Sequence, residues 1–184
     1  MDRNRIINSV APIRICDNGG WTDTWFAEYG KIFNIGVYPY MGKSHNSSDI
    51  HQRVIKELEN AGPECPKIAD LRRTAEQSRD AVYAGDFELL GRAMIENTEA
   101  QGRLHAALVS PAARSAIAIA KSHGASGWKV NGAGGEGGSI TLLTGPHSQA
   151  KRALIREIEQ TDPNFKNVPI YLSRYGLRTW ETKV

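Results

Sequence analysis

The strongest structural signal in the chain is GWKVNGAGGEGGSITLL, residues 127–143. Apolar residues on both sides of a glycine-rich turn, over 126–132 and 138–145, predict two strands joined by a loop. The turn NGAGGEGGS, residues 131–139, holds five glycines whose unshielded backbone N–H groups suit contact with phosphate oxygens. A flexible hairpin loop has the same composition. Both hypotheses stay open, because the spacing is not the G-x-G-x-x-G dinucleotide motif and a strand follows instead of a helix.

The rest of the chain predicts helices in its middle and further strands near both ends. Helical spacing and capping signals predict helices from Ser47 to the stop NAGPECP, and then over 67–84, 86–108, 111–124 and 147–160. Strands are predicted over 5–15 and 30–40, joined by a glycine turn, and over 167–176. The pattern indicates an α+β fold without internal repeats.

Composition and charge bound the class of protein. The 184 residues are 40% apolar and 23% charged, and the net charge of +3 comes without a lysine- or arginine-rich block. Neither nucleic acid nor a membrane surface is therefore a favoured partner. Cys16 and Cys65 lack the spacing of a zinc site, and the sequence predicts no metal-binding residues. Two unpaired thiols, without a signal-peptide or membrane-spanning stretch, predict a cytoplasmic protein.

The predicted helix over 86–108 carries polar residues within an apolar stripe. Its 3.6-residue periodicity aligns Phe87, Leu90, Met94, Asn97, Gln101, His105 and Leu108. Burying Asn97, Gln101 or His105 without a partner costs roughly 1–3 kcal/mol each. These three side chains therefore satisfy one another, turn towards solvent, or line a polar cavity.

A short GKS motif at 42–44 lies between a predicted strand and a predicted helix, as the end of a Walker A phosphate loop does. The Walker pattern requires a glycine where this chain has Val37. A Walker-type nucleotidase is therefore the weakest hypothesis, and it leaves Lys43, His45 and His51 as candidates for a polar site.

Two longer motifs resemble those of a known superfamily. APIRICDNGGWTDT at 11–24 and GWKVNGAGGEGGSITLL at 127–143 are similar to the first and third signature motifs of the GHMP kinases, which include galactokinase, homoserine kinase and mevalonate kinase. Within that superfamily, GGWTDT, GKSH, ENTEAQ and GWKVNGAGG resemble bacterial sugar kinases related to heptose-phosphate kinase and fucokinase. The resemblance covers residues 9–180.

This resemblance implies a fold with two parts. Residues 41–184 would form the C-terminal GHMP kinase domain, a ferredoxin-like α/β sandwich with extra helices. Residues 1–40 would be a remnant β-hairpin, with the first motif, of the N-terminal ribosomal-S5-domain-2-like domain.

The resemblance also implies a site for ATP, Mg²⁺ and a sugar or sugar phosphate. Arg14 would stand near the transferring phosphoryl group as the catalytic cation, and Asp23 would accept hydrogen bonds from sugar hydroxyls. The other substrate-side residues implied are Gly20, Thr22, Ser44, His45, Asn97, Gln101 and His105. The nucleotide-side residues implied are Lys43, Gly132, Ala133, Gly134, Gly135, Gly137 and Gly138.

The second signature motif of the superfamily, a P-x-x-x-G-L-G-S-S-A phosphate loop, does not occur in the 184 residues. NIGVYPY runs directly into MGKSH, so about 150 residues, one domain's length, are expected to be missing between Tyr40 and Met41. Without the phosphate loop, a magnesium ligand and the base, the chain is expected to have weak or no activity. The exposed edges of the two N-terminal strands would then either pair in a homo-oligomer or be covered by the C-terminal domain. The alternative function is a non-catalytic module that binds a sugar phosphate or another protein.

Overall fold

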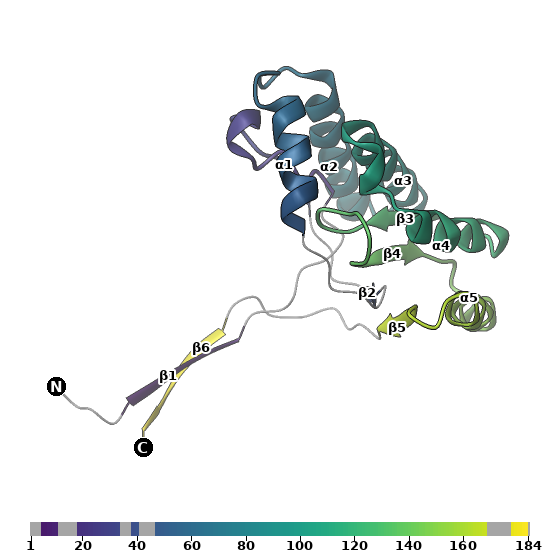
Figure 1. Cartoon of the computed structure of the whole chain (residues 1–184). Helices are drawn as coiled ribbons and strands as arrows, with labels where there is room; N and C mark the ends of the chain where they lie inside the picture. Colours follow the sequence, from purple (N-terminus) through teal and green to yellow (C-terminus); the bar gives the residue numbers. More distant parts are fainter. Residues whose placement is uncertain (1–4, 11–17, 34–37, 41–46, 169–177, 184) are drawn as a thin grey trace.

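The computed structural model describes residues 5–10, 18–33, 38–40, 47–168 and 178–183. It has a helical body, a layer of short strands beside it, and a two-stranded ribbon that stands apart from both (Figure 1). The helices are α1 (Ser47–Leu58), α2 (Pro66–Ala84), α3 (Phe87–Leu104), α4 (Pro111–Ser122) and α5 (Ser148–Thr161), with the 3-10 turns η1 (Trp25–Ala27) and η2 (Ala106–Leu108). The strands are β1 (Arg5–Val10), β2 (Tyr38–Tyr40), β3 (Gly127–Val130), β4 (Ile140–Leu143), β5 (Lys166–Val168) and β6 (Arg178–Lys183). This mixture confirms the α+β class.

Local sequence signals set the helix boundaries. Pro66 and Pro111 occupy the first turns of α2 and α4, where a missing N–H costs no intrahelical hydrogen bond. The Asp86 carboxylate accepts a bond of 2.8 Å from the N–H of Leu89 and caps the start of α3. Gly85 ends α2 in the left-handed region, with φ at 68°. No helix in the described ranges is both long and apolar enough to cross a bilayer.

The helix predicted over 86–108 ends earlier, at Leu104, so this boundary was wrong. His105 adopts an extended backbone, and its Nδ1 accepts a hydrogen bond of 3.2 Å from the N–H of Ala107. That bond caps η2, which continues the chain to Leu108. Helical periodicity in the sequence does not reveal that a side chain caps the turn that follows the helix. His105 therefore leaves the stripe on which the sequence placed it.

The strand layer consists of short antiparallel pairs. β3 pairs with β4, from Gly127 opposite Leu143 to Val130 opposite Ile140, which confirms the predicted strand–loop–strand unit. β2 pairs with β5, and β2 also contacts β4. The order across the layer is thus β5–β2–β4–β3. The chain runs through it as β-α-β-β-α-β, with several helices in the first crossover, which is the ferredoxin-like sequence of elements.

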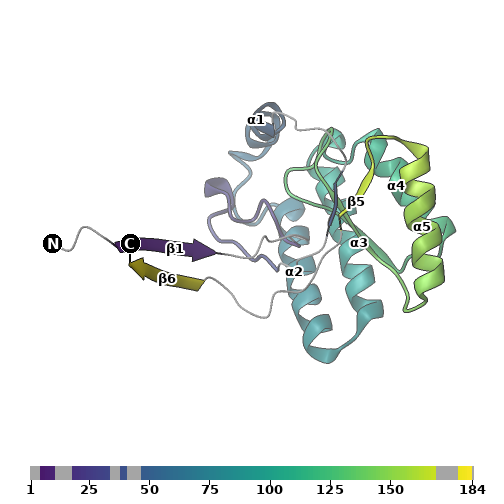
Figure 2. The same ribbon diagram turned by 90° about the horizontal axis from the view of Figure 1, so that it is seen from below.

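The predicted N-terminal hairpin is not confirmed. β1 pairs with β6, from Arg5 opposite Lys183 to Val10 opposite Arg178, and the sequence did not predict β6. Within the described residues, the two segments of the expected hairpin meet at one isolated bridge, Asn18 with Phe33. Side-chain alternation marks a strand without naming its partner, so a pairing across almost the whole chain was not predictable. Figure 2 shows the β1–β6 ribbon away from the body in a second view.

Three apolar clusters lie within the described body, and the smallest of them joins Ala81, Leu90 and Met94 of α2 and α3. The other two are larger. One joins α4 and α5 to the strand layer and includes Ala116, Val130, Ile140, Leu154 and Phe165. The other lies among α1, α2 and α3 and includes Trp21, Phe26 and Ala27 from the segment 18–33. The buried members of this cluster are Trp21, Phe26, Ala27, Val54, Leu58, Ile68, Leu71, Ala100, Leu104 and Leu108. The first-motif segment therefore packs on the helical body and not on the ribbon.

A buried guanidinium fixes that segment in place. Arg72 of α2 donates from Nε to the carbonyl of Tyr29 at 3.1 Å, from Nη1 to the carbonyl of Pro63 at 2.6 Å, and from Nη2 to the carbonyl of Ala27. Its guanidinium also lies 3.6 Å from the centre of the Tyr29 ring. Three carbonyls from two separate segments thus share one cation, which satisfies backbone groups that no helix or sheet pairs.

Candidate functional site

The glycine loop, residues 131–139, joins β3 to β4, and backbone and side-chain hydrogen bonds link its two ends. The Asn131 N–H donates to the carbonyl of Ser139 at 2.9 Å, and Asn131 Nδ2 donates to Ser139 Oγ at 3.0 Å. Thr141 Oγ1 donates to Asn131 Oδ1 at 3.2 Å. These bonds bring the two ends of the loop together, so the residues between them project as one turn.

The loop backbone requires glycine. Its five glycines, Gly132, Gly134, Gly135, Gly137 and Gly138, all have positive φ, between 60° and 89°. The N–H of Gly135 donates to the carbonyl of Leu108 in η2 at 3.0 Å. A Cβ at Gly134 would lie inside 3.0 Å of that same carbonyl oxygen. Both conformation and close approach therefore exclude side chains at the position that docks on η2.

A buried polar chain anchors the start of the loop to α3. Lys129, 2% exposed on β3, donates from Nζ to Gln101 Oε1 at 2.9 Å and to the carbonyl of Val130. Gln101, 1% exposed, donates in turn from Nε2 to the carbonyl of Gly132 at 2.9 Å. The lysine thereby fixes which end of the glutamine amide faces the loop, because an ammonium group donates and never accepts. Gln101 thus positions the first glycine of the loop.

Thr98 ties α3 to β3 one turn earlier. Its Oγ1 lies 3.1 Å from the carbonyls of Met94 and Trp128, and it accepts from the N–H of Val130 at 3.3 Å. Together with Gln101, this hydroxyl links α3 to consecutive residues of the strand that leads into the loop. A buried network with satisfied partners in a low-dielectric interior holds its members in one arrangement.

The loop presents backbone donors to a ligand. In the described part of the chain, the N–H groups of Gly132, Ala133, Gly137 and Gly138 donate to no protein oxygen. Of these four residues, Gly132 is exposed, Ala133 and Gly138 are half-buried, and Gly137 is buried. Free backbone N–H groups of this kind are suited to contact with phosphate oxygens. Glu136 is exposed within the loop, so its carboxylate opposes an anion placed beside it. Anion binding here therefore depends on the backbone donors and on cations from elsewhere.

The polar stripe does not act as one unit. Asn97 is 1% exposed and donates from Nδ2 to Thr74 Oγ1 of α2 at 2.6 Å, away from the loop. His105 Nε2 lies 3.9 Å from Glu57 Oε1 of α1. Of the three polar residues predicted to border the site, Gln101 alone bonds to the described loop. The other two join helix to helix.

The first motif contributes a buried turn and one exposed carboxylate. Thr22 is fully buried, and its Oγ1 lies 2.7 Å from the carbonyl of Gly19 and accepts from the N–H of Lys31 at 2.9 Å. This hydroxyl therefore shapes the turn. Asp23 is exposed and Gly20 is half-buried beside it. Asp23 is therefore accessible to a ligand, as is the neighbouring Trp25, which is 67% exposed.

The turn and the glycine loop share one apolar cluster. Trp21 is buried in the cluster among α1, α2 and α3, against which Ala133 of the loop also packs. The edge of its ring meets His51 of α1, with ring centres 4.8 Å apart. The first and third motifs thus both contact this one cluster, although more than a hundred residues separate them in the sequence.

Several expected residues lie outside the described ranges, and others were missed. The expected residues outside these ranges are Arg14, Lys43, Ser44 and His45. Lys129, Asn131 and Thr98 were not predicted, although Gly127, Lys129 and Asn131 alternate along β3 and share its α3-facing side. The sequence signal that could have identified these residues was the lysine at an alternating position of the predicted strand. Sequence pattern did not show that this lysine is buried.

Magnesium has no ligand set among the described residues. No three histidine, cysteine, aspartate or glutamate side chains converge there. Mg²⁺ prefers oxygen ligands in octahedral geometry and usually binds through carboxylates together with substrate phosphates. The described residues therefore include no cluster of three such side chains that could hold a metal ion by itself.

Comparison with known proteins agrees with this geometry. The family described as GHMP kinases C terminal matches residues 37–160, which is more than half of the chain. No curated protein matches the sequence. Similar solved structures are L. major mevalonate kinase in complex with R-mevalonate (TM-score 0.58, 16% identity), the Lin0012 protein from Listeria innocua (0.64, 15%) and a further mevalonate kinase (0.51, 15%).

These structural matches cover 84%, 82% and 78% of this chain but 46%, 44% and 38% of the three other chains. The chain therefore spans less than half the length of these solved structures. At such identities the likeness concerns the fold. The profile match, the β-α-β-β-α-β order and the anchored glycine loop together show that the chain belongs to the GHMP kinase family, of which it carries the C-terminal domain.

Proposed function

We propose that the chain is the loop-bearing part of an ATP-dependent phosphotransferase whose acceptor is a hydroxyl of a sugar or sugar phosphate. The observation that carries the proposal is the glycine loop, with left-handed glycines, anchors on α3 and η2, and backbone donors that fit phosphate oxygens. Membership of the GHMP kinases supports the transfer chemistry. The stretches GGWTDT and ENTEAQ resemble those of bacterial sugar kinases, which supports a sugar as the acceptor.

In this proposal the loop and the first motif face the same ligand. Gly132, Ala133, Gly137 and Gly138 bind phosphate oxygens through their N–H groups, and Gln101 and Lys129 hold the loop in position. Asp23 accepts hydrogen bonds from sugar hydroxyls. Arg14 neutralises the transferring phosphoryl group, while Lys43, Ser44 and His45 extend the site from the segment before α1.

The proposal places the phosphate loop, the magnesium ligand and the base outside these 184 residues. Loss of a single preorganised donor typically lowers a rate about 100- to 1,000-fold, so loss of all three leaves negligible transfer by the chain alone. A site divided in this way supports the second candidate function, binding of a sugar phosphate without turnover. The division at residue 40, an oligomer that covers strand edges and a cytoplasmic location remain predictions.

Calorimetric titration of the purified chain tests the proposal. The ligands are ATP–Mg²⁺ and a panel of hexoses, hexose phosphates and heptose phosphates, each titrated alone and in combination. We expect heat from at least one sugar phosphate, no micromolar binding of ATP–Mg²⁺, and negligible release of ADP. Asp23→Asn should weaken the sugar phosphate, whereas Asp80→Asn on the exposed side of α2 should not.

Each other outcome contradicts a named part of the proposal. Micromolar ATP–Mg²⁺ binding would show that the chain holds a complete nucleotide site. No binding of any sugar phosphate would remove the acceptor class. Equal effects of the Asp23 and Asp80 substitutions would remove Asp23 from the site.

A further inference from the structure

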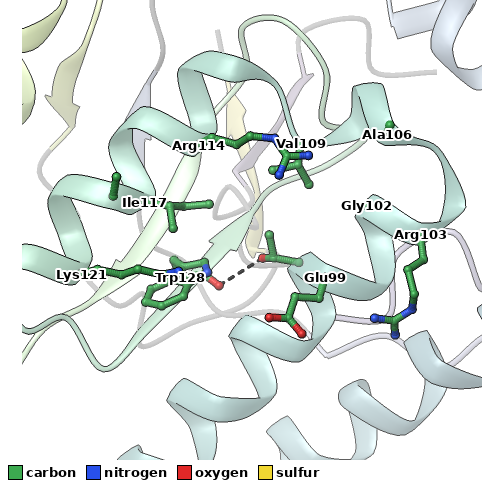
Figure 3. A pocket seen from close by; sticks show the side chains of 11 residues that line it. Glu99, Gly102, Arg103, Ala106, Val109, Arg114, Ile117, Lys121 and Trp128 are labelled. Carbon is green, nitrogen blue, oxygen red and sulfur yellow. Dashed lines mark hydrogen bonds between the residues drawn. The ribbon is translucent and has the colours of Figure 1, made fainter.

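A cleft separate from the glycine loop opens between α3 and α4. It has a volume of about 600 Å³, within the roughly 300–1,000 Å³ range of small-molecule sites. Figure 3 shows it between the two helices, with Trp128 of β3 at its floor. The described residues that line it include none from 131–139. This cleft is therefore distinct from the proposed phosphate site.

Small residues make the cleft hollow. Gly102 on α3, Ala106 on η2 and Ala118 on α4 lie on its walls, at positions where larger side chains would fill the space. A Cβ at Gly102 would meet Val109 at an ordinary contact distance of 3.5 Å, so the fold does not require glycine there for lack of room. The cleft between α3 and α4 is therefore open because small side chains line it.

The floor of the cleft is apolar and partly aromatic. Val109 and Ile117 are 6% and 9% exposed, and Trp128 is half-buried between the two helices. The Trp128 carbonyl is bound to Thr98, which fixes this residue against α3. A rigid indole with an accessible face is a stacking surface for a flat ring.

The rim of the cleft is cationic. Arg103, Arg114 and Lys121 line it against one carboxylate, Glu99. Arg103 is committed to Asp70 at 2.7 Å, whereas no described carboxylate lies within ion-pair distance of Arg114 or Lys121. Lys121 Nζ lies 4.9 Å from the centre of the Trp128 ring. Arg114 and Lys121 therefore lack a described acidic partner, and Lys121 lies over one face of the indole in a cation–π contact.

The spacing of these cations selects the ligand. Arg114, Ala118 and Lys121 follow one another at i, i+4 and i+7, so they share one face of α4. The two charges start about 10 Å apart along the helix axis, which leaves room for a ring over Ala118 and Trp128. An anionic group attached to that ring meets a cation at either end, and Glu99 on the opposite wall accepts from an N–H or O–H of the ligand.

We propose that this cleft binds a small organic anion that combines a flat ring with a phosphate or carboxylate group. The ring stacks on Trp128, and the anionic group pairs with Arg114 or Lys121. The inference does not rest on the proposed kinase function, because it uses no residue of the glycine loop.

Titration of the full chain with phenyl phosphate, followed by ¹H–¹⁵N NMR, tests this inference. We expect a saturable shift of the Trp128 indole N–H, with the amides of Gly132–Gly138 unmoved. The double variant Arg114→Ala/Lys121→Ala should weaken binding about 2- to 5-fold, as the loss of one partly exposed charge pair would, whichever of the two cations binds the phosphate. The matched control Arg152→Ala/Arg156→Ala removes two exposed cations from α5 and should leave the affinity unchanged.

A second variant keeps the charges and fills the space. Ala118→Leu on the exposed side of α4 should abolish the Trp128 shift while the rest of the spectrum stays dispersed. Inorganic phosphate and benzyl alcohol supply the charge and the ring separately, and each should bind at least tenfold more weakly than phenyl phosphate. Equal binding by either one, a shift confined to the glycine loop, or no effect of the α4 variants would overturn the inference.

Discussion

Replacement of Gln101 by methionine removes the bridge between the buried lysine and the glycine loop. Methionine matches the length of glutamine and fills the same volume, so the change deletes polar atoms with little loss of packing. Lys129 Nζ loses its 2.9 Å acceptor, and the carbonyl of Gly132 loses its 2.9 Å donor. Water does not replace the partner that Lys129 Nζ loses, because Lys129 is 2% exposed, whereas Gly132 is exposed and water can bind its carbonyl.

The expected cost follows from these two bonds. A hydrogen bond to a charged group contributes about 1.5–3 kcal/mol, and water replaces the bond lost by the exposed Gly132 carbonyl, so Gln101→Met should lower the free energy of unfolding by about 1.5–3 kcal/mol. In the double variant Gln101→Met/Lys129→Met, the lost bond between the pair is counted once. We therefore expect the double change to cost about 1.5–3 kcal/mol less than the sum of the two single changes.

Urea unfolding, followed by circular dichroism, measures these free energies. Gln52→Met on the exposed side of α1 is the matched control and should stay within about 0.5 kcal/mol of the wild type. A Gln101 variant as stable as this control, or single costs that simply add in the double variant, would refute the argument that Gln101 couples Lys129 to the loop.

Three further perturbations test other parts of the structure. Gly132→Ala meets open space and should cost about 1–2 kcal/mol for its left-handed backbone alone, while Gly134→Ala should cost at least about 1 kcal/mol more, because its Cβ displaces the loop from Leu108; equal urea midpoints for the two variants would contradict this. Arg72→Met should destabilise the chain by about 3–5 kcal/mol, because it leaves three carbonyls unpaired, whereas its exposed neighbour Arg73→Met should cost less than about 1 kcal/mol; similar thermal unfolding of both would be contrary evidence. Ile7→Thr should change stability by less than about 0.5 kcal/mol, since Ile7 is 75% exposed on the ribbon, and a larger loss in calorimetry would mean that the ribbon supports the body.

The elements that the sequence predicted well depend on local signals. The helices α2 and α4 begin at proline and α3 begins after the capping residue Asp86, and the β3–β4 unit follows directly from alternation around five glycines. The pairing of β1 with β6 was not predictable, since the two strands lie at opposite ends of the sequence. Side-chain alternation carries no information on such a partner.

The site was predictable in outline and not in its supporting residues. The glycine loop and Gln101 were expected, and the structure joins them by a hydrogen bond. Asn97 has the same polarity and lies on the same helix, yet it bonds to Thr74 of α2. The difference depends on which neighbour each face of α3 meets, and helical periodicity does not supply that. Lys129 was missed because a lysine is rarely expected to be buried.

In the proposed function the glycine loop faces the phosphate of a small-molecule ligand. Titration of the chain with hexose and heptose phosphates, followed by the amide signals of Gly132–Gly138 in ¹H–¹⁵N NMR, is the direct test. We predict saturable shifts of these loop amides with at least one sugar phosphate, together with a loss of affinity in Gly134→Ala. Loop amides that stay unmoved by every ligand, or shifts confined to residues far from the loop, would contradict the claim.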